Sequence, residues 1–160
     1  MKYSNKTIFA ALLATSSAAI ADDQTELQFQ LEANIPAQQY FVEFQDPAFG
    51  TTTQTMAWDN VNEKLEDVST TLLAKNNVGK ITAHLDSAAA LSNGTQTIPL
   101  TVSINNLALP VGATSAVEII NASTNTTQSL PLTVTPTGTP TYAPGDYNGA
   151  VKMMFDFELP

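Results

Sequence analysis

Apolar and polar residues alternate with a period of two in several short segments of this chain, and this alternation constrains the fold more than any other feature. In residues 79–85 (GKITAHL) every second residue from Ile81 onward is apolar, and residues 38–44, 97–104 and 147–159 show the same alternation. Successive side chains of a β-strand point to opposite faces, so each segment has one apolar face for a core. The sequence therefore predicts short β-strands.

Turn signals separate these segments. Residues 116–134 are predicted as two strands around a polar loop, and residues 60–75 as mostly extended. Short alternating strands with a turn about every 8 to 15 residues are typical of an all-β sandwich or barrel. The turn signals are Asp46-Pro47, Asn76-Asn77, Asn93-Gly94, Asn105-Asn106 and the Pro- and Gly-containing segments 110–112 and 136–145.

Residues 1–21 are predicted to be a secretion signal. Lys2 and Lys6 form a positive start, an apolar run begins at Ile8, and Ala19-Ile20-Ala21 supplies a small-x-small cleavage site before Asp22. The apolar run is too short, and too rich in Ala, Ser and Thr, for a membrane anchor. No later stretch is long and apolar enough to cross a membrane. We therefore expect an exported, soluble protein with one domain in the remaining 139 residues, 160 minus 21.

The composition limits the partners and the sources of stability. After removal of the signal, four lysines, no arginine and fifteen acidic residues remain, which gives a net charge of 4 minus 15, or −11. Such a chain lacks the basic surface that binds nucleic acid, and anionic lipid headgroups would repel it. It also has no cysteine, so no disulfide can stabilise the exported domain. Stability must come from core burial or from a partner.

Catalytic and metal-binding patterns are absent from the sequence. His84 is the only histidine, and the alternation predicts that it is exposed on the outer face of its strand. No nucleophile motif and no metal-ligand spacing occurs, and the acidic group Glu63, Glu66 and Asp67 is typical of a solvated surface. Trp58, the single tryptophan, is expected in the core because of its size. The sequence thus predicts no enzyme activity, no cofactor and no metal site.

The two ends of the mature chain carry the most information about function. Residues 25–36 (TELQFQLEANIP) alternate almost without error and end at Pro36, which cannot donate a ladder hydrogen bond. This segment is either an ordinary first strand or a strand that leaves its own domain. The last residues form a long, aromatic-rich alternating segment. If that segment is the sixth strand of a seven-stranded immunoglobulin-like sandwich, a seventh apolar strand is missing.

The sequence resembles the colonisation-factor-type fimbrial major pilins of the alpha-class chaperone–usher pathway. The resemblance spans the whole chain and depends on the order of several segments: the secretion signal, the alternating strand with its proline at 25–36, LLAKNNVGKITAHLDS, LSNGTQTIPLTVSINNLAL and APGDYNGAVKMMFDFEL. The tip adhesins of such pili are longer chains with two domains, so this chain resembles the shaft subunit.

The resemblance implies an incomplete immunoglobulin-like β-sandwich completed by a donor strand. A periplasmic chaperone first fills the open groove, and at the outer-membrane usher the N-terminal strand of the next subunit replaces the chaperone strand. The result is a homopolymer at the cell surface, an adhesive fimbria with a tip adhesin, and host-cell glycans are a further candidate partner. The predicted domains are a signal peptide (1–21), a donor strand (22–36) and a pilin sandwich (37–160).

The predicted site is therefore a surface that binds another subunit. Pro36 is the predicted hinge between donor strand and sandwich. The alternative function is a secreted β-sandwich that folds alone and binds glycans through Trp58 or Tyr40. The predicted donor residues are Leu27, Phe29, Leu31, Ala33 and Ile35, and the predicted acceptor-groove residues are Val151, Met153, Phe155 and Phe157.

Overall fold

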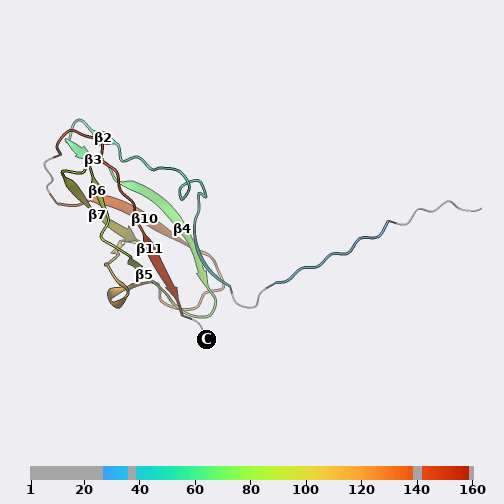
Figure 1. Cartoon of the computed structure of the whole chain (residues 1–160). Helices are drawn as coiled ribbons and strands as arrows, with labels where there is room; N and C mark the ends of the chain where they lie inside the picture. Colours follow the sequence, from blue (N-terminus) through green and yellow to red (C-terminus); the bar gives the residue numbers. More distant parts are fainter. Residues whose placement is uncertain (1–26, 36–38, 139–141, 159–160) are drawn as a thin grey trace, which may run out of the picture. The chain divides into compact units, whose positions relative to one another are not determined.

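The computed structural model describes residues 27–35, 39–138 and 142–158 of the chain. The chain divides after Asn34 into two parts, residues 1–34 and 35–160. The described residues of the first part, 27–34, form no strand and no helix. Every strand described below belongs to the second part, and Figure 1 labels most of them on the ribbon.

The larger of the two main sheets is antiparallel throughout and orders its strands β1-β4-β10-β7-β6, with the short strand β8 beside β7. Its longest members, β4 and β10, pair over seven residues. The strands are β1 (Tyr40–Phe44), β4 (Val68–Asn76), β6 (Ala90–Ser92), β7 (Thr97–Ile104), β8 (Leu107–Ala108) and β10 (Gln128–Pro136).

The second main sheet has three antiparallel strands in the order β11-β5-β9. They are β5 (Ile81–Leu85), β9 (Val117–Ile120) and β11 (Met153–Phe157). A separate small hairpin joins β2 (Trp58–Asp59) to β3 (Lys64–Leu65), and a single 3-10 turn, η1 (Ala113–Ser115), precedes β9. The described part of the chain is thus all-β apart from this turn, as the alternation predicts.

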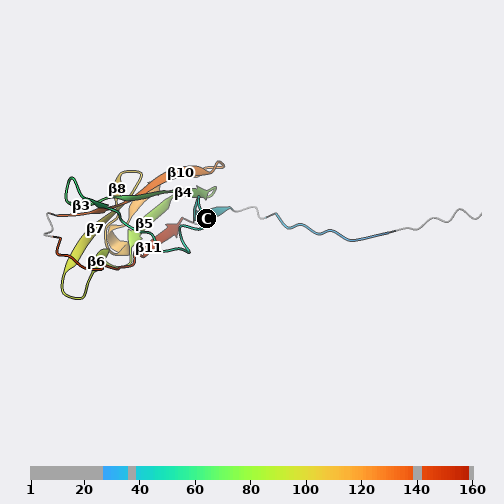
Figure 2. The ribbon, with the colours of Figure 1, turned by 90° about the horizontal axis from the view of Figure 1, so that it is seen from above.

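The core lies between the two main sheets. Figure 2 shows β4 and β10 on one side and β5 and β11 on the other. The inward residues of β5 are Ile81, Ala83 and Leu85, all at most 3% exposed. They belong to one apolar cluster with residues of β4, β7 and β10 from the other sheet, including Leu72, Ala74, Val102, Ile104, Leu130 and Leu132. Burial of two facing apolar sheet surfaces is the main stabilisation of a β-sandwich.

The turn between β7 and β8 shows why local sequence predicts the strand ends well. Asn105 and Asn106 both have positive φ, 50° and 63°. A two-residue hairpin loop of this geometry matches the right-handed twist of the flanking strands, and Asn tolerates the left-handed region better than most residues. The predicted turn at Asn105-Asn106 is therefore confirmed.

The C-terminal segment differs from the single long strand that the alternation predicts. Asn148 pairs with Ser92 beside the larger sheet, whereas β11, which begins at Met153, pairs with β5 in the other sheet. The segment therefore passes from one sheet to the other between these residues. Gly149 permits this path, because a Cβ there would lie 2.1 Å from the Ala90 carbonyl oxygen. The period of two does not reveal a change of sheet.

Candidate functional site

Two strand edges lie next to each other along one side of the sandwich. Among the described residues, β1 pairs with β4 alone and β11 with β5 alone, so each strand has one unpaired edge. The rings of Tyr40, which begins β1, and Phe157, which ends β11, are 5.2 Å apart between centroids. Phe44, at the other end of β1, lines the same cavity as Met153. The two strands therefore run in opposite directions along the gap between them.

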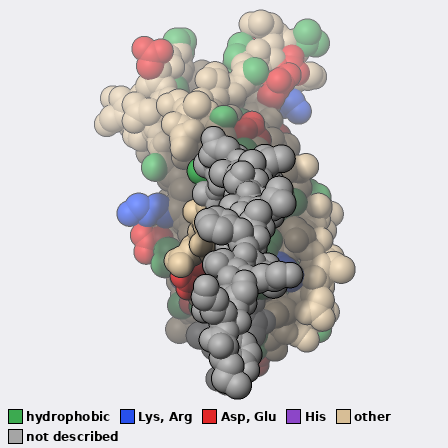
Figure 3. Space-filling model, turned by 90° about the vertical axis from the view of Figure 1, so that its right-hand side faces the viewer, with side chains coloured by type: hydrophobic (Ala, Val, Ile, Leu, Met, Phe, Trp, Pro, Cys, Tyr) green, Lys and Arg blue, Asp and Glu red, His purple; other side chains and the backbone are tan. Residues whose placement is uncertain are grey.

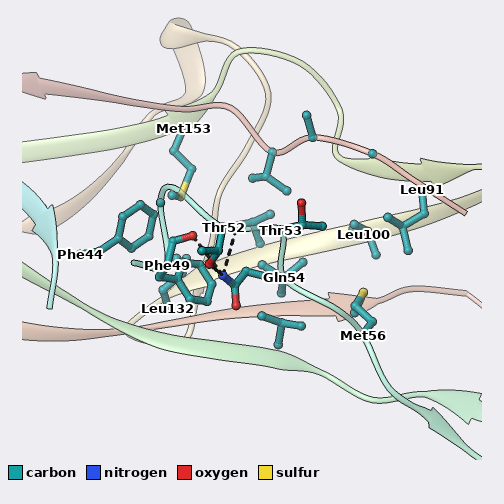
Figure 4. Close-up of a pocket in the computed structure, with 17 residues that line it drawn as sticks. Phe44, Phe49, Thr52, Thr53, Gln54, Met56, Leu91, Leu100, Leu132 and Met153 are labelled. Atoms are coloured by element: carbon teal, nitrogen blue, oxygen red, sulfur yellow. Dashed lines mark hydrogen bonds between the residues drawn. The ribbon is translucent and has the colours of Figure 1, made fainter. Parts of the chain in front are cut away.

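A cavity of about 430 Å³ lies at the Phe44–Met153 end of this gap. Figure 4 shows Phe44 and Phe49 near Met153 at one end of the cavity, and Leu91, Leu100 and Met56 toward the other. The rest of its lining includes Val102, Leu132 and Val134 from the larger sheet and Gly149, Ala150 and Val151 from the C-terminal segment. The lining is predominantly apolar, as expected of a surface that binds an apolar partner.

A second cavity, of about 540 Å³, continues the first along β11. The two share Phe44, Val151 and Met153, so they form one groove, which we call the β1–β11 groove. The second cavity adds Val42, Glu43 and Leu72 on one side and Asp86, Lys152, Met154 and Phe155 on the other. An apolar floor between two unpaired strand edges can accept an additional strand, which would supply both ladder hydrogen bonds and apolar side chains.

The chain after β1 forms one wall of the groove through a turn held by its own hydrogen bonds. The hydroxyl groups of Thr51 and Thr52 donate to the Ala48 carbonyl, at 3.1 and 2.8 Å. The Gln54 amide donates to the Phe49 carbonyl at 3.2 Å and to the Thr52 hydroxyl at 2.9 Å. These bonds position the Phe49 ring, 5.0 Å from that of Phe44. The sequence predicts only the Asp46-Pro47 turn here, and no pattern in it indicates this wall.

The structure brings the four predicted acceptor residues to the C-terminal side of this gap. Val151, Met153 and Phe155 line the groove, and Phe157 lies at its end against Tyr40. Met153, Phe155 and Phe157 also pack against the core, while Val151 precedes β11 and is 37% exposed.

The predicted donor residues are exposed. The exposed fractions are 90% for Leu27, 78% for Phe29, 87% for Leu31 and 82% for Ile35, and Ala33 is also exposed. Four large apolar side chains therefore lie exposed at alternate positions, interrupted only by Ala33. Their exposure to water is unfavourable. The predicted hinge Pro36 and the predicted signal 1–21 lie outside the described residues.

Asn76 anchors the end of β11 and was not identified as important from the sequence. It is fully buried, and its amide donates to the carbonyls of Lys80 and Glu158 at 3.1 and 3.2 Å. Its side-chain oxygen accepts from the Val78 backbone N–H at 3.0 Å. The residue thus joins β4, the start of β5 and the end of β11. The pair Asn76-Asn77 resembled an ordinary turn signal, and no local pattern distinguishes a buried amide from an exposed one.

Two expectations for single residues are wrong. His84 points to the outer face of β5, as predicted, but it is only 8% exposed, and its Nδ1 lies 3.5 Å from the Asp156 carboxylate of β11. Trp58 is 43% exposed instead of buried, because it belongs to the small β2–β3 hairpin. Its ring packs edge-on against that of Tyr142, 5.1 Å away.

Three charged side chains line the groove, those of Glu43, Asp86 and Lys152. On the face drawn in Figure 3, acidic side chains are more widespread than basic ones. Hydrogen bonds from Asn62 lower the pKa of Asp59, and the bond to Glu118 raises the pKa of Lys80, but both groups lie outside the groove. The described residues contain no group of three potential metal ligands and no helix that could span a membrane.

The fold and the groove together define an immunoglobulin-like β-sandwich of the pilin class. A solved structure with the same fold is the CooA pilin subunit from enterotoxigenic Escherichia coli, at a TM-score of 0.50 and 18% sequence identity, covering 63% of this chain and 75% of that chain. No curated protein matches the sequence significantly.

The family model described as CS1 type fimbrial major subunit matches residues 25–156, and the chain belongs to this family. The predicted resemblance to colonisation-factor-type fimbrial major pilins is confirmed. The protein is therefore a structural subunit of a pilus shaft. Its place is the surface fimbria that such subunits form by polymerisation.

Proposed function

We propose that this subunit polymerises head to tail by donor-strand exchange and forms the shaft of an adhesive fimbria. Residues 25–36 of one copy enter the β1–β11 groove of the next copy. Before that step a periplasmic chaperone fills the groove, and the outer-membrane usher replaces the chaperone strand with the strand of the next subunit. The finished fibre extends from the cell surface and presents a tip adhesin to host cells, whose glycans are candidate receptors.

The observation that carries the proposal is the groove itself. It is apolar, it lies between two unpaired strand edges, and the same chain holds an exposed alternating segment of suitable length. The groove and the donor segment are different surfaces of the same chain, so their contact is heterologous. Such a contact repeats from copy to copy without closing into a ring, and so it produces a fibre. Addition of a strand to a sheet edge is a known mode of protein association.

The energy available from this contact is large. Burial of Leu27, Phe29, Leu31 and Ile35 stabilises the contact by about 1.5–3 kcal/mol for each side chain, or roughly 10 kcal/mol before the costs of association. Ladder hydrogen bonds add about 1 kcal/mol each. The sum is comparable to the net stability of a whole domain, about 5–15 kcal/mol. We therefore expect the subunit to depend on a strand in the groove.

Deletion of residues 22–36 tests the proposal. The truncated chain should form no fibres, and it should be unstable or aggregate when expressed alone. A peptide of residues 25–36, present during refolding, should bind and raise the melting temperature. A peptide with Phe29→Asp and Leu31→Asp is the matched control and should not. The proposal fails if the truncated chain still forms fibres, or if it is stable, soluble and unaffected by the peptide.

A further inference from the structure

The groove contains a single cation among its lining residues, and this bears on how the proposed donor strand is aligned. The charged side chains that line the groove are Glu43, Asp86 and Lys152. The Lys152 ammonium lies 3.9 Å from the Asp86 carboxylate, with the two side chains 72% and 55% exposed. An exposed pair at that distance is weak, so Lys152 remains able to bind another anion.

The donor segment contains one acid in the middle of its outer face, Glu32, flanked there by Gln30 and Asn34. The inner, apolar face of the strand determines which residues can point outward, because side chains alternate. Shifts of the donor strand are therefore limited to steps of two residues. Each step moves Glu32 to a different neighbour on the C-terminal strand.

The direction of the added strand follows from the sheets already present. All strand pairs in the two main sheets are antiparallel. A strand that adds to the free edge of β11 in the same manner runs antiparallel to β11, and therefore parallel to β1, because β1 and β11 run in opposite directions. The C-terminal end of the donor strand then reaches the end of the groove near Gly149.

We propose that Glu32 of one copy pairs with Lys152 of the next, and that this pair sets the register of the donor strand. The proposal rests on donor-strand exchange as the mode of assembly. With Glu32 opposite Lys152, Ile35 faces Gly149 and Ala33 faces Val151. A shift of two residues in either direction moves Glu32 to Ala150 or to Met154, neither of which carries a charge.

The inner face is compatible with the same register. It places the small Ala33 beside Val151, and it places Ile35 at Gly149, where the C-terminal segment already passes toward β6 and the position of a Cβ is filled by the Ala90 carbonyl. Phe29 then faces Phe155, and an aromatic pair across strands is favourable. The register also brings Leu27 to Phe157, so the half-exposed Tyr40 ring, which now contacts Phe157, must move aside. The same register places Glu26 opposite Glu158. These two carboxylates repel each other, so the favourable contacts of the donor strand end before this pair.

Cysteine cross-linking in assembled fibres of the full chain tests the register, since the chain contains no cysteine of its own. The pair Gln30→Cys with Met154→Cys faces across the strands in this register and leaves Glu32 and Lys152 in place. Directly opposite Cβ atoms are close enough for a disulfide, whereas positions offset by two residues are not. Oxidised fibres of this variant should give a ladder of covalent multimers under denaturing conditions.

The matched controls are Gln28→Cys with Met154→Cys and Gln30→Cys with Asp156→Cys, which correspond to shifts of two residues in the two directions. Neither should give a ladder. A ladder from either control in place of the first pair overturns the register and leaves donor-strand exchange intact. Fibres that assemble without any of the three ladders, and that still form after deletion of residues 22–36, overturn donor-strand exchange itself.

A double-mutant cycle tests the charge pair. Glu32→Gln and Lys152→Gln should each speed fibre dissociation in denaturant about two- to fivefold, the range expected for one exposed ion pair. The double variant should dissociate no faster than either single variant, because the second change removes nothing further. Lys64→Gln, which removes a cation outside the groove, should leave the rate unchanged. Equal rates for wild type and both single variants, or effects that multiply in the double variant, overturn the pair.

Discussion

Asn76 shows how much of the groove can depend on one buried side chain. Its amide donates to the carbonyls of Lys80, directly before β5, and of Glu158, directly after β11. Asn76→Asp replaces this donor with a carboxylate and leaves the carbonyls of Lys80 and Glu158 facing a negative charge. A buried polar group without a partner costs about 1–3 kcal/mol, and a buried charge costs more.

We therefore expect Asn76→Asp to lower the free energy of unfolding by about 3–5 kcal/mol, as measured by denaturant unfolding of the full chain. Asn60→Asp makes the same chemical change at an exposed position and should have an effect within about 0.5 kcal/mol. If the two substitutions had equal effects, the role of Asn76 as an anchor would be refuted.

Gly149 gives the second prediction at this scale. A Cβ at this position would lie 2.1 Å from a backbone carbonyl oxygen, which cannot move without disturbing β6. We expect Gly149→Ala to destabilise the fold by about 2–4 kcal/mol, because the C-terminal segment must move away from β6 and lose its bridge between Asn148 and Ser92. Thermal unfolding measures the loss. Ala150→Ser, one residue later and exposed, should leave the melting temperature nearly unchanged.

At the scale of elements, the alternation in the sequence predicted strands well where a strand stays in one sheet. The predicted segments 79–85 and 97–104 contain β5 and β7, and residues 116–134 contain β9 and most of β10 around a loop. It did not predict β11 well, because the C-terminal segment changes sheets and only five of its residues form the strand. Alternation records which side of a strand is apolar and carries no information about which sheet that side covers.

One wall of the candidate groove was predictable from the alternation, and the opposite wall was not. The inward residues of β11 follow from alternation, but the opposite wall, including Phe49, belongs to an irregular turn without any period. Such a wall is determined by local hydrogen bonds among Ala48, Thr52 and Gln54. Sequence patterns of threonine and glutamine do not predict which of these bonds form. The burial of His84 was unpredictable on similar grounds, because its neighbour Asp156 lies on β11, which is distant in the sequence.

Phe49 allows this wall to be tested. The side chain is half-buried and packs on Phe44, so Phe49→Ala should cost about 1–3 kcal/mol in stability, less than a fully buried phenylalanine. Because the residue also lines the groove, assembled fibres of the variant should dissociate faster in denaturant than wild-type fibres. Val61→Ala, at a position that is 89% exposed, is the control and should change neither quantity. Unchanged fibre dissociation in Phe49→Ala would show that this wall does not contact the inserted strand.

At the scale of the whole molecule, the net charge opposes association between copies. Each mature subunit is expected to carry −11, so two subunits repel each other before the groove and the donor strand meet. Salt screens this repulsion, with a Debye length of about 8 Å at physiological ionic strength against about 30 Å in dilute buffer. We therefore expect the assembly rate, followed by light scattering, to rise with added salt. A rate that falls with salt would indicate that local attraction outweighs the net repulsion.

The dependence of stability on a donor strand also predicts how the subunit can be made self-sufficient. A chain that lacks residues 22–36 and carries a copy of residues 25–36 after Pro160, joined by a short flexible linker, can fold its own strand back along β11 as a hairpin. That arrangement is antiparallel to β11, as proposed for the donor strand of the next subunit. The tethered strand has a high effective concentration, so it should occupy the groove almost completely.

We expect this fusion to remain monomeric and to melt at a higher temperature than the truncated chain without the added strand. The measurements are size-exclusion chromatography for the oligomeric state and calorimetry for the melting temperature. The matched control carries Phe29→Asp and Leu31→Asp in the added strand, which removes its apolar face and should abolish the gain. The fusion and its control have the same linker and length and differ only in the apolar face of the added strand. Equal melting temperatures would therefore mean that this face adds no stability and that the groove does not bind the segment.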